Sequence, residues 1–445
     1  MDGLAGRVAT GCRGGGGPGG HVGGRLLRHR AVLPAAVAAV RAGGGAPETD
    51  ELPGPATGGR PVRVVQVLTQ SGGGPVDHTV EVAVGLARRG VDSHVVAPPD
   101  VRRRVGAAGA AVTWHDQEAT SKRDLAGLAG LARSLRALAP DVLHLQDRRA
   151  GWVGRGLGRS LPGTAVVYTL HGVADGLSDH VAGNLLADTR RRRDRWYYLH
   201  GERWITRWGR ARVVSPSHAV ADFAVRHVGL DPSRVDVVPN GVDPDRFRPA
   251  PTGTTRTPRA GERPRLVWLG GLVPVKRADV LVEAVAAMRE DVEVLVAGDG
   301  ELAAQVRELA AARFPGTSAT GREVRLLGHV ADPAPLLQQA DGFVLTSAAE
   351  SCPMALLQAM ATGLPAVATA VGGVPEVWGP VAPQLLCPPG DPHSLASALD
   401  RLVADPALRA DLGARARERV LATYTTEHCL DGLQRTYATA LEERA

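Results

Sequence analysis

The sequence predicts an α/β protein made of two successive doubly wound parallel sheets. Three observations predict this class. Short apolar runs alternate with helical patterns from residue 62 onward, as in parallel sheets whose strands are joined by helices. A segment rich in Pro, Thr, Gly and Arg interrupts the alternation at residues 248–264. The alternation then restarts at residue 265.

In the first half, runs such as VRVVQVL and DVLHL predict buried strands. The expected strands are residues 62–68, 93–97, 141–145, 165–170 and 211–215. The expected helices are residues 76–89 and 125–138. In the second half the expected strands are residues 265–269, 292–297, 324–327, 342–346 and 366–369. The expected helices there are residues 279–288, 301–313, 354–362, 394–404 and 407–424.

These patterns predict a domain at residues 61–247, a linker at 248–264 and a second domain at 265–424. Residues 1–60 are rich in glycine and arginine, and we interpret them as a disordered tail. The apolar stretch at residues 31–40 leaves a weak signal-peptide core as the alternative. Ligands of doubly wound sheets bind beyond the carboxyl ends of the strands, so we expect the site in a cleft between the two domains.

The composition argues against several classes. The net charge is +6, but only two of the 52 basic residues are lysine, and the arginines are spread along the chain. Binding to nucleic acid, which needs clustered basic residues, is therefore not predicted. No apolar stretch reaches the ~18 residues of a membrane-spanning helix. The four cysteines include no CxxC pair, which fits a reducing cytoplasm.

A glycine-rich turn, Ser71–Gly74, joins the first expected strand to its helix. Such a turn lets backbone amides approach an anion at a helix N-terminus. It is not the GxGxxG pattern, and no acidic residue ends the second strand, so a dehydrogenase is not predicted.

Two further segments carry polar groups at strand ends. Lys276 lies in a loop between a strand and a helix, where it could reach a phosphate. Glu350 follows another strand, and Pro353 suits the first turn of the next helix. The free amides of Met354 and Ala355 would then point into the cleft. With the Gln358 side chain, these groups suit a polyhydroxylated anionic ligand.

At this level of detail the sequence resembles a family 4 glycosyltransferase with the GT-B fold. The stretch from residue 62 to about 440 carries the resemblance. Its motifs are Asn240–Asp243 with Phe247, Ala297–Gly300, Leu327-Gly328, the Glu350 segment and the stretch GLPAVATAVGGVPEV.

The resemblance implies transfer of a sugar from a nucleotide-sugar donor, UDP- or GDP-linked, with retention at the anomeric carbon. It also implies a role for each matching residue. Glu350 would bind the donor sugar, Gln358 the ribose and Lys276 the diphosphate, while His171 would lie on the acceptor side near the transferred sugar. The remaining implied contacts are Gly73 and Gly74 of the first loop, and Gly328, His329 and Val330 at the base. A final helix, residues 425–445, would cross back to an acceptor-binding first domain.

The chemistry does not require a metal ion or other cofactor. Lys276 and the helix N-terminus after Glu350 can stabilise a leaving diphosphate, and no DxD cluster stands at a strand end. The chain departs from the family at three places. Gly271 replaces an arginine, Gln358 replaces a carboxylate, and Cys352-Pro353 replaces an aromatic–glycine pair. A non-catalytic homologue that binds a sugar nucleotide or a partner subunit is therefore the alternative.

Residues 190–208 combine arginines with aromatic rings, and Trp204 and Trp208 would share one helix face. One interpretation is an ordinary helix with its aromatics in the core. The other is contact with an anionic membrane, which would bring a cytoplasmic enzyme to a lipid-linked acceptor at the inner face of the plasma membrane. The sequence leaves the acceptor open among glycans, lipid-linked sugars and small molecules.

Overall fold

The computed structural model describes residues 60–105, 110–117, 124–173, 175–185, 192–251, 263–315 and 321–444. The expected tail lies outside the described residues except for Arg60, and so does most of the expected linker. Among the described helices, none combines the length and apolarity that crossing a bilayer requires.

The first half of the chain forms a seven-stranded parallel sheet in the order β3-β2-β1-β4-β5-β6-β7. Its strands are β1 (Arg63–Val67), β2 (Asp92–Ala97), β3 (Thr113–Asp116), β4 (Val142–Leu145), β5 (Ala165–Thr169), β6 (Arg212–Ser215) and β7 (Val235–Val237). The helices between them are α1 (Gly74–Arg88), α2 (Pro99–Val105), α3 (Leu125–Leu138), α4 (Arg148–Gly158), α5 (Arg192–Gly209) and α6 (His218–Phe223). Short helical turns complete this half: η3 (Asp175–His180), η4 (Ala224–Val228) and η5 (Pro232–Arg234).

Helices cover both faces of this sheet, as the doubly wound prediction requires. Successive residues of a strand point to opposite faces. Val64 accordingly packs with α1 and the C-terminal helix, whereas Val65 packs with Leu131 of α3 and Ala150 of α4. The continuous apolar runs of the central strands follow from this double burial.

The second half forms a six-stranded parallel sheet in the order β10-β9-β8-β11-β12-β13. Its strands are β8 (Arg265–Leu269), β9 (Val292–Ala297), β10 (Arg322–Gly328), β11 (Gly342–Leu345), β12 (Ala366–Thr369) and β13 (Leu386–Cys387). Its helices are α7 (Ala278–Ala287), α8 (Ala303–Arg313), α9 (Ala334–Gln338), α10 (Met354–Ala361), α11 (Val374–Val377), α12 (Pro392–Ala404) and α13 (Pro406–Thr423). The turns η6 (Pro274–Lys276) and η7 (Pro383–Leu385) lie in its loops. The two predicted parallel sheets are therefore confirmed.

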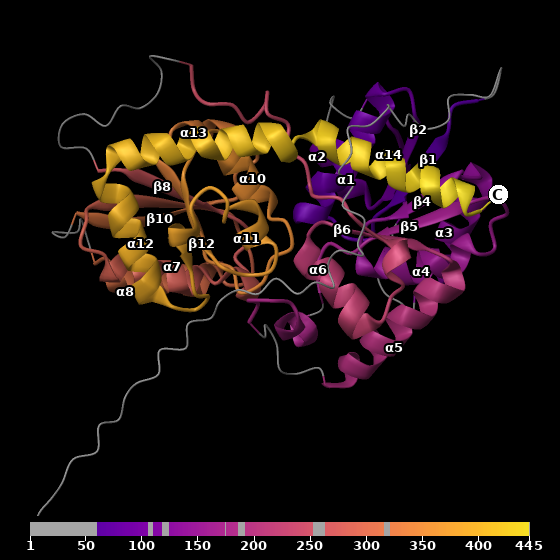
Figure 1. Ribbon diagram of the computed structural model, residues 1–445, viewed down its shortest axis with the longest axis horizontal. Coiled ribbons are helices and arrows are strands. Elements are labelled where there is room, and N and C mark those ends of the chain that lie inside the picture. The colour runs from indigo at the N-terminus through magenta and orange to yellow at the C-terminus, as the bar shows by residue number, and fades with distance from the viewer. Residues whose placement is uncertain are drawn as a thin grey trace, which may run out of the picture. The chain divides into compact units, whose positions relative to one another are not determined.

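The last helix, α14 (Thr426–Glu442), packs against α1 and β5 of the first half (Figure 1). Leu430 fills the space above Gly85, where a Cβ atom would lie 2.5 Å from the Leu430 Cδ1 atom. The segment that leads into α14 runs beside the segment after β7, where the chain first passes from the first half to the second. The Val242 amide donates to the Tyr424 carbonyl at 2.9 Å, and the Thr426 amide donates to the Val242 carbonyl at 3.1 Å.

Each sheet has one point where the strand order reverses direction. In the first sheet the reversal falls between β1 and β4, and in the second between β8 and β11. Loops that leave neighbouring strands in opposite directions open a crevice at such a point. In the first sheet Asp147 joins these loops, since its carboxylate accepts hydrogen bonds from the backbone amide and the hydroxyl of Thr69.

Candidate active site

The reversal point of the second sheet brings together two predicted site residues. Lys276 ends the turn after β8, and Glu350 lies in the loop after β11. The Lys276 Nζ atom lies 2.5 Å from the Glu350 Oε1 atom, and the Ser347 hydroxyl donates to the same oxygen at 2.6 Å. The Glu350 side chain is only 10% exposed and the Lys276 side chain 28%. A partly desolvated ion pair therefore occupies this crevice.

The backbone beneath the pair is fixed by bonds between the two loops. The Thr346 hydroxyl donates to the Lys276 carbonyl at 2.8 Å, and the indole of the buried Trp268 donates to that hydroxyl at 3.0 Å. The Ala348 amide donates to the Val275 carbonyl at 2.7 Å. These hydrogen bonds fix the backbone that carries Lys276 and Glu350, so both charged side chains are held in place before any ligand binds.

Helix α10 begins directly beside Glu350. The helix begins at Met354, as the sequence predicted, and Pro353 is its N-cap, directly before the first turn. Because Pro353 is extended and precedes the helix, the backbone amides of the first helical turn have no acceptor within the helix. Among the described residues, the amides of Met354 and Ala355 donate to no protein acceptor. They remain available to an anion at the positive end of the helix dipole.

Gln358 lies further along α10 and is 8% exposed. Its side-chain amide makes no hydrogen bond within the described part of the chain. Its amide atoms are therefore open to a hydrogen bond from a ligand.

The loop after β12 approaches Glu350 closely from the other side. Gly372 has a φ of 48°, and a Cβ atom there would lie 1.8 Å from the Glu350 carbonyl oxygen. The Gly373 amide donates to that carbonyl at 3.4 Å. Glycine is therefore needed in this turn for the backbone to reach the site.

Gly328 ends β10, which lies two strands away from β8, and His329 and Val330 follow it. The Gly328 carbonyl accepts from the Gly298 amide at 2.8 Å, and the His329 side chain is exposed. Within the described residues no hydrogen bond or ion pair links these three residues to Lys276 or Glu350. The structure thus places them at the same sheet edge, but not in contact with the ion pair.

Contacts between the halves place the glycine-rich turn near α10. Gly73 and Gly74 lie at the start of α1 and are exposed. A Cβ atom on Gly74 would lie 3.9 Å from the Met354 Cγ atom. The Asn240 side chain donates to the Cys352 carbonyl at 2.8 Å, which holds the segment before α10 against the first half.

His171 lies two residues beyond β5, near the reversal point of the first sheet. Its Nε2 atom lies 2.9 Å from the Gln146 Oε1 atom, and its ring meets the His78 ring edge-on with centroids 5.0 Å apart. Burial, with the neighbouring His78 and His144 rings, holds the pKa of His171 well below its usual range. The imidazole is therefore neutral at physiological pH.

Sequence reasoning missed Ser347 and Gln146, which contact Glu350 and His171 directly. A signal for Gln146 existed, because a glutamine that follows a continuous apolar strand lies at the edge where ligands bind.

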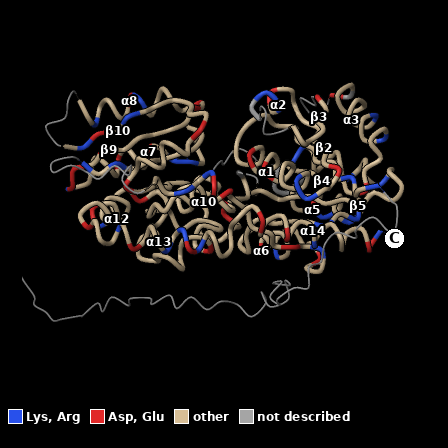
Figure 2. Tube along the Cα trace, turned by 90° about the horizontal axis from the view of Figure 1, so that it is seen from above, with Lys and Arg blue, Asp and Glu red and all other residues tan. Residues whose placement is uncertain are grey.

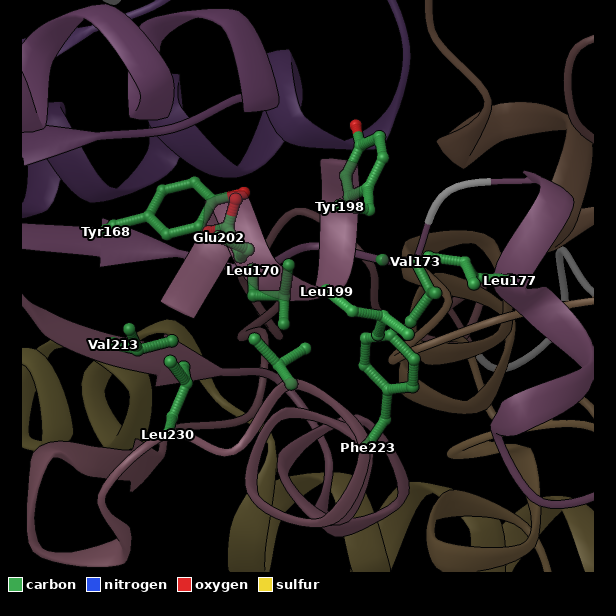
Figure 3. Close-up of a pocket in the computed structure, with 12 residues that line it drawn as sticks. Tyr168, Leu170, Val173, Leu177, Tyr198, Leu199, Glu202, Val213, Phe223 and Leu230 are labelled. Carbon is green, nitrogen blue, oxygen red and sulfur yellow. The ribbon is translucent and has the colours of Figure 1, made fainter. Parts of the chain in front are cut away.

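A tight pocket that the sequence did not predict is lined in part by the end of β5 and by the segment that follows it (Figure 3). Its lining is mainly aliphatic and aromatic, with Leu170, Val173 and Leu230 among the contributors. Its one charged group, Glu202, is ion-paired with the buried Arg155 at 2.5 Å. The lining is mostly apolar and its carboxylate is already paired, so the pocket does not suit a sugar ring.

Comparison with known proteins agrees with this geometry. Residues 72–246 match the family model of Glycosyltransferase Family 4, and residues 263–405 match that of Glycosyl transferases group 1. A D-inositol 3-phosphate glycosyltransferase of Mycolicibacterium paratuberculosis is 28% identical over 402 residues, covering 85% of this chain and 88% of that protein. One of Mycobacterium bovis is 29% identical over 406 residues, covering 85% and 82%.

Solved structures share the fold. Anabaena HepE, in complex with UDP-glucose, superposes with a TM-score of 0.69 at 18% identity, covering 86% of this chain and 99% of that one. Sucrose-phosphate synthase from Thermosynechococcus elongatus gives 0.71 at 20% identity, covering 86% and 100%. Two Rossmann-like parallel sheets of this kind define the GT-B class of glycosyltransferases. Within that class, the chain belongs to the group 1, family 4 glycosyltransferases.

Proposed function

We propose that this glycosyltransferase is retaining, needs no metal ion and uses a UDP- or GDP-linked sugar donor. The observation that carries the proposal is the Lys276–Glu350 pair beside the N-terminus of α10. It offers a cation, a carboxylate and free backbone amides within one crevice.

Negative charge builds on the nucleotide diphosphate as the glycosidic bond breaks. Lys276 and the amides of Met354 and Ala355 would stabilise that charge. A diphosphate that draws the Lys276 ammonium towards itself frees the Glu350 carboxylate to accept hydrogen bonds from hydroxyls of the donor sugar. Positive charge on the protein then does the work that a metal ion does in other transferases.

The way Glu350 is held argues against a covalent intermediate on the route to retention. Its Oε1 atom already accepts from Lys276 and Ser347, so this carboxylate orients the sugar and is a poor covalent nucleophile. Attack by the acceptor hydroxyl on the face from which the diphosphate leaves is the simpler course. His171, at the carboxyl edge of the first sheet, would meet the acceptor side of the transferred sugar.

We assign the donor to the second domain and the acceptor to the first. Gln358 would accept a hydrogen bond from the ribose through its carbonyl oxygen, which would satisfy its unpartnered amide. Gly328, His329 and Val330 would meet the base, and Gly73 and Gly74 would approach the diphosphate from α1. The curated relatives are named for D-inositol 3-phosphate, so a phosphorylated polyol is the first acceptor to test.

Calorimetry with UDP-, GDP- and ADP-sugars tests the donor site. We expect binding to one nucleotide class that is lost in Lys276→Ala, and turnover that is lost in Glu350→Ala. Retention is read from the anomeric configuration of the product by NMR, and metal independence from unchanged activity in EDTA. Donor binding without transfer to any acceptor would instead favour the non-catalytic alternative.

A second proposal concerns location. Trp204 and Trp208 of α5 are 59% and 42% exposed, and their rings stack with centroids 5.7 Å apart. Arg203 and Arg207 beside them are exposed and make no ion pair with a described residue. Figure 2 marks the basic positions of the trace, including those around α5, in blue. Exposed indole rings among arginines suit the interface of an anionic bilayer. We infer peripheral contact with the cytoplasmic face of a membrane.

Co-sedimentation of the full chain with vesicles tests this location. We expect binding to phosphatidylglycerol-containing vesicles at low salt, little binding to phosphatidylcholine, and loss of binding in the Trp204→Ala, Trp208→Ala double variant. Leu421→Ala is a matched control, because Leu421 is 45% exposed on a different helix, α13. Equal binding of the double variant and the control would overturn the proposal.

A further inference from the structure

A network of polar side chains lies in the core directly behind His171. Its members come from neighbouring strands β1, β4 and β5 and from the C-terminal helix α14. Except for His171, all are at most 1% exposed: Gln66, His144, Gln146, Thr169 and Tyr437. Polar groups this deep are expected to be hydrogen-bonded, and such networks fix the orientation of their members.

The network runs from α14 to the site in three steps. The Tyr437 hydroxyl lies 2.7 Å from the His144 Nδ1 atom. That nitrogen lies 3.3 Å from the Gln146 Nε2 atom. The Gln146 Oε1 atom in turn lies 2.9 Å from the His171 Nε2 atom.

In the orientation of the two glutamine amides in the structure, one assignment of protons is consistent with every link, and it leaves the buried Gln66 Nε2 atom without a partner. The Gln146 amide nitrogen lies 2.7 Å from the Gln66 Oε1 atom, to which it can only donate. Its second proton faces the His144 Nδ1 atom at 3.3 Å and shares the single lone pair of that nitrogen with the Tyr437 hydroxyl at 2.7 Å. The other nitrogen of His144, Nε2, then donates to the Thr169 hydroxyl at 2.7 Å. Gln146 is left with its carbonyl oxygen facing His171, and a carbonyl only accepts.

We propose that the chain Tyr437–His144–Gln146 holds His171 in the tautomer with the proton on Nε2. The Nδ1 atom of His171 has no hydrogen-bond partner among the described residues, and the side chain is half-buried. Its lone pair is therefore presented as an acceptor to a hydroxyl of the bound sugars. Tyr437, His144 and Gln146 are positioning residues. Only the role of His171 in the site rests on the proposed function.

The surroundings of His171 keep it neutral. The titratable groups that face it are His78 on α1 and His144 on β4. Burial lowers the pKa of His78 to about 4, and burial with the charge of His78 lowers that of His144 to about 3. Neither is charged at neutral pH, so the tautomer is set by hydrogen bonds rather than by ion pairing.

Nitrogen-15 NMR on the full chain tests the tautomer directly. The chain has 14 histidines, so comparison with a His171→Asn variant assigns the signal. We expect the Nε2–H pattern in the wild type and a mixture of tautomers in Tyr437→Phe, which removes one hydroxyl and keeps the buried ring. Tyr168→Phe is the matched control, because Tyr168 is an equally buried tyrosine of the same domain outside the network. An Nδ1–H tautomer in the wild type would overturn the inference.

Kinetics provide an independent readout. Tyr437→Phe should lower kcat by about tenfold, the effect of one lost hydrogen bond, with the donor KM unchanged. Gln146→Glu puts a carboxylate against the Nε2 proton, which favours the imidazolium. The acidic limb of the kcat/KM profile should therefore move up by about one pH unit or more. Gln146→Met should lower kcat without this movement.

The outcomes separate the inference from the proposed function. The Nε2–H tautomer in a chain that transfers no sugar would support the inference and remove the proposed function. Turnover with an unmoved pH profile in Gln146→Glu would overturn the inference and keep the function. A melting temperature for each variant shows whether it has folded, and NMR of Tyr437→Phe still decides if Gln146→Glu does not fold.

Discussion

Lys276 and Glu350 form an ion pair although 74 residues separate them in the chain. The pair joins the loops after β8 and β11, so the fold itself holds this cation against this carboxylate. In the proposed reaction, donor binding exchanges this contact for contacts with the diphosphate and the sugar. The pair therefore sets the starting state of the reaction.

Lys276→Ala should weaken donor binding by about 10- to 100-fold, because one charge-assisted hydrogen bond contributes about 1.5–3 kcal/mol. Titration calorimetry measures this change. Arg313→Ala, which breaks an exposed ion pair with Glu283, should leave donor affinity unchanged. If Lys276→Ala binds the donor as tightly as the wild type, Lys276 is not the diphosphate ligand.

Gly271→Arg should increase donor affinity by about tenfold through a new contact with the diphosphate. Gly271 is exposed, and a Cβ atom there would approach nothing closer than the Asp299 carbonyl oxygen at 3.8 Å. Gly298→Ala is the contrasting variant, with φ at 150° and a Cβ atom 1.8 Å from the Gly270 carbonyl oxygen. Thermal unfolding should show Gly298→Ala destabilised by more than about 1 kcal/mol and Gly271→Arg unchanged.

Gln358→Glu should make donor affinity depend on pH. A carboxylate at this mostly buried position has its pKa raised by desolvation, so it is neutral at low pH and ionised at high pH. The ionised form is the better acceptor for ribose hydroxyls. Calorimetry at pH 6 and pH 8 should show tighter binding at pH 8 in this variant than in the wild type. An identical pH dependence in both would place the ribose elsewhere.

Acid should destabilise the first domain through its buried histidines. The pKa of His78 is about 4 in the fold and about 6.5 in the unfolded chain. Above pH 6.5 both states are neutral and the stability is unaffected. Between pH 6.5 and 4 the unfolded chain binds a proton that the fold excludes, so the free energy of unfolding decreases as the pH falls. Urea titrations of His78→Phe should show a shallower decrease over this window.

Most strands could be predicted because double burial produces continuous apolar runs. The strands at residues 265–269 and 292–297 begin and end where the sequence predicted. Strand β3 was missed because it is a short edge strand whose residues are partly exposed, so it carries no such run.

Helix α4 was missed for a different reason. Its glycines lower helix propensity, yet they let the helix approach the sheet closely. A Cβ atom on Gly154 would lie 2.1 Å from the Leu145 Cδ2 atom, and one on Gly151 would lie 2.5 Å from the Tyr168 ring. The packing of α4 against the sheet thus outweighs its low helix propensity, and the sequence alone does not show that packing.

The site was predicted as separate residues, and the structure supplies their pairing. Strand-end position and residue type marked Lys276, Glu350 and His171. That Lys276 contacts Glu350 depends on strand order, which places β8 next to β11. The link from His171 to Tyr437 depends on α14 returning to the first sheet, which no local pattern reports.

That return has a consequence for the protein during its synthesis. The core around Val64 and Val142 is closed by Leu433 and Tyr437, which belong to the last turns of α14. A ribosome that has made the whole first sheet and all of the second still holds these residues in its tunnel. The nascent first domain therefore exposes an apolar face until α14 has emerged from the ribosome, whereas the second domain is complete earlier. A chain shortened at its C-terminus would keep that exposed face, which makes it a substrate for chaperones and proteases.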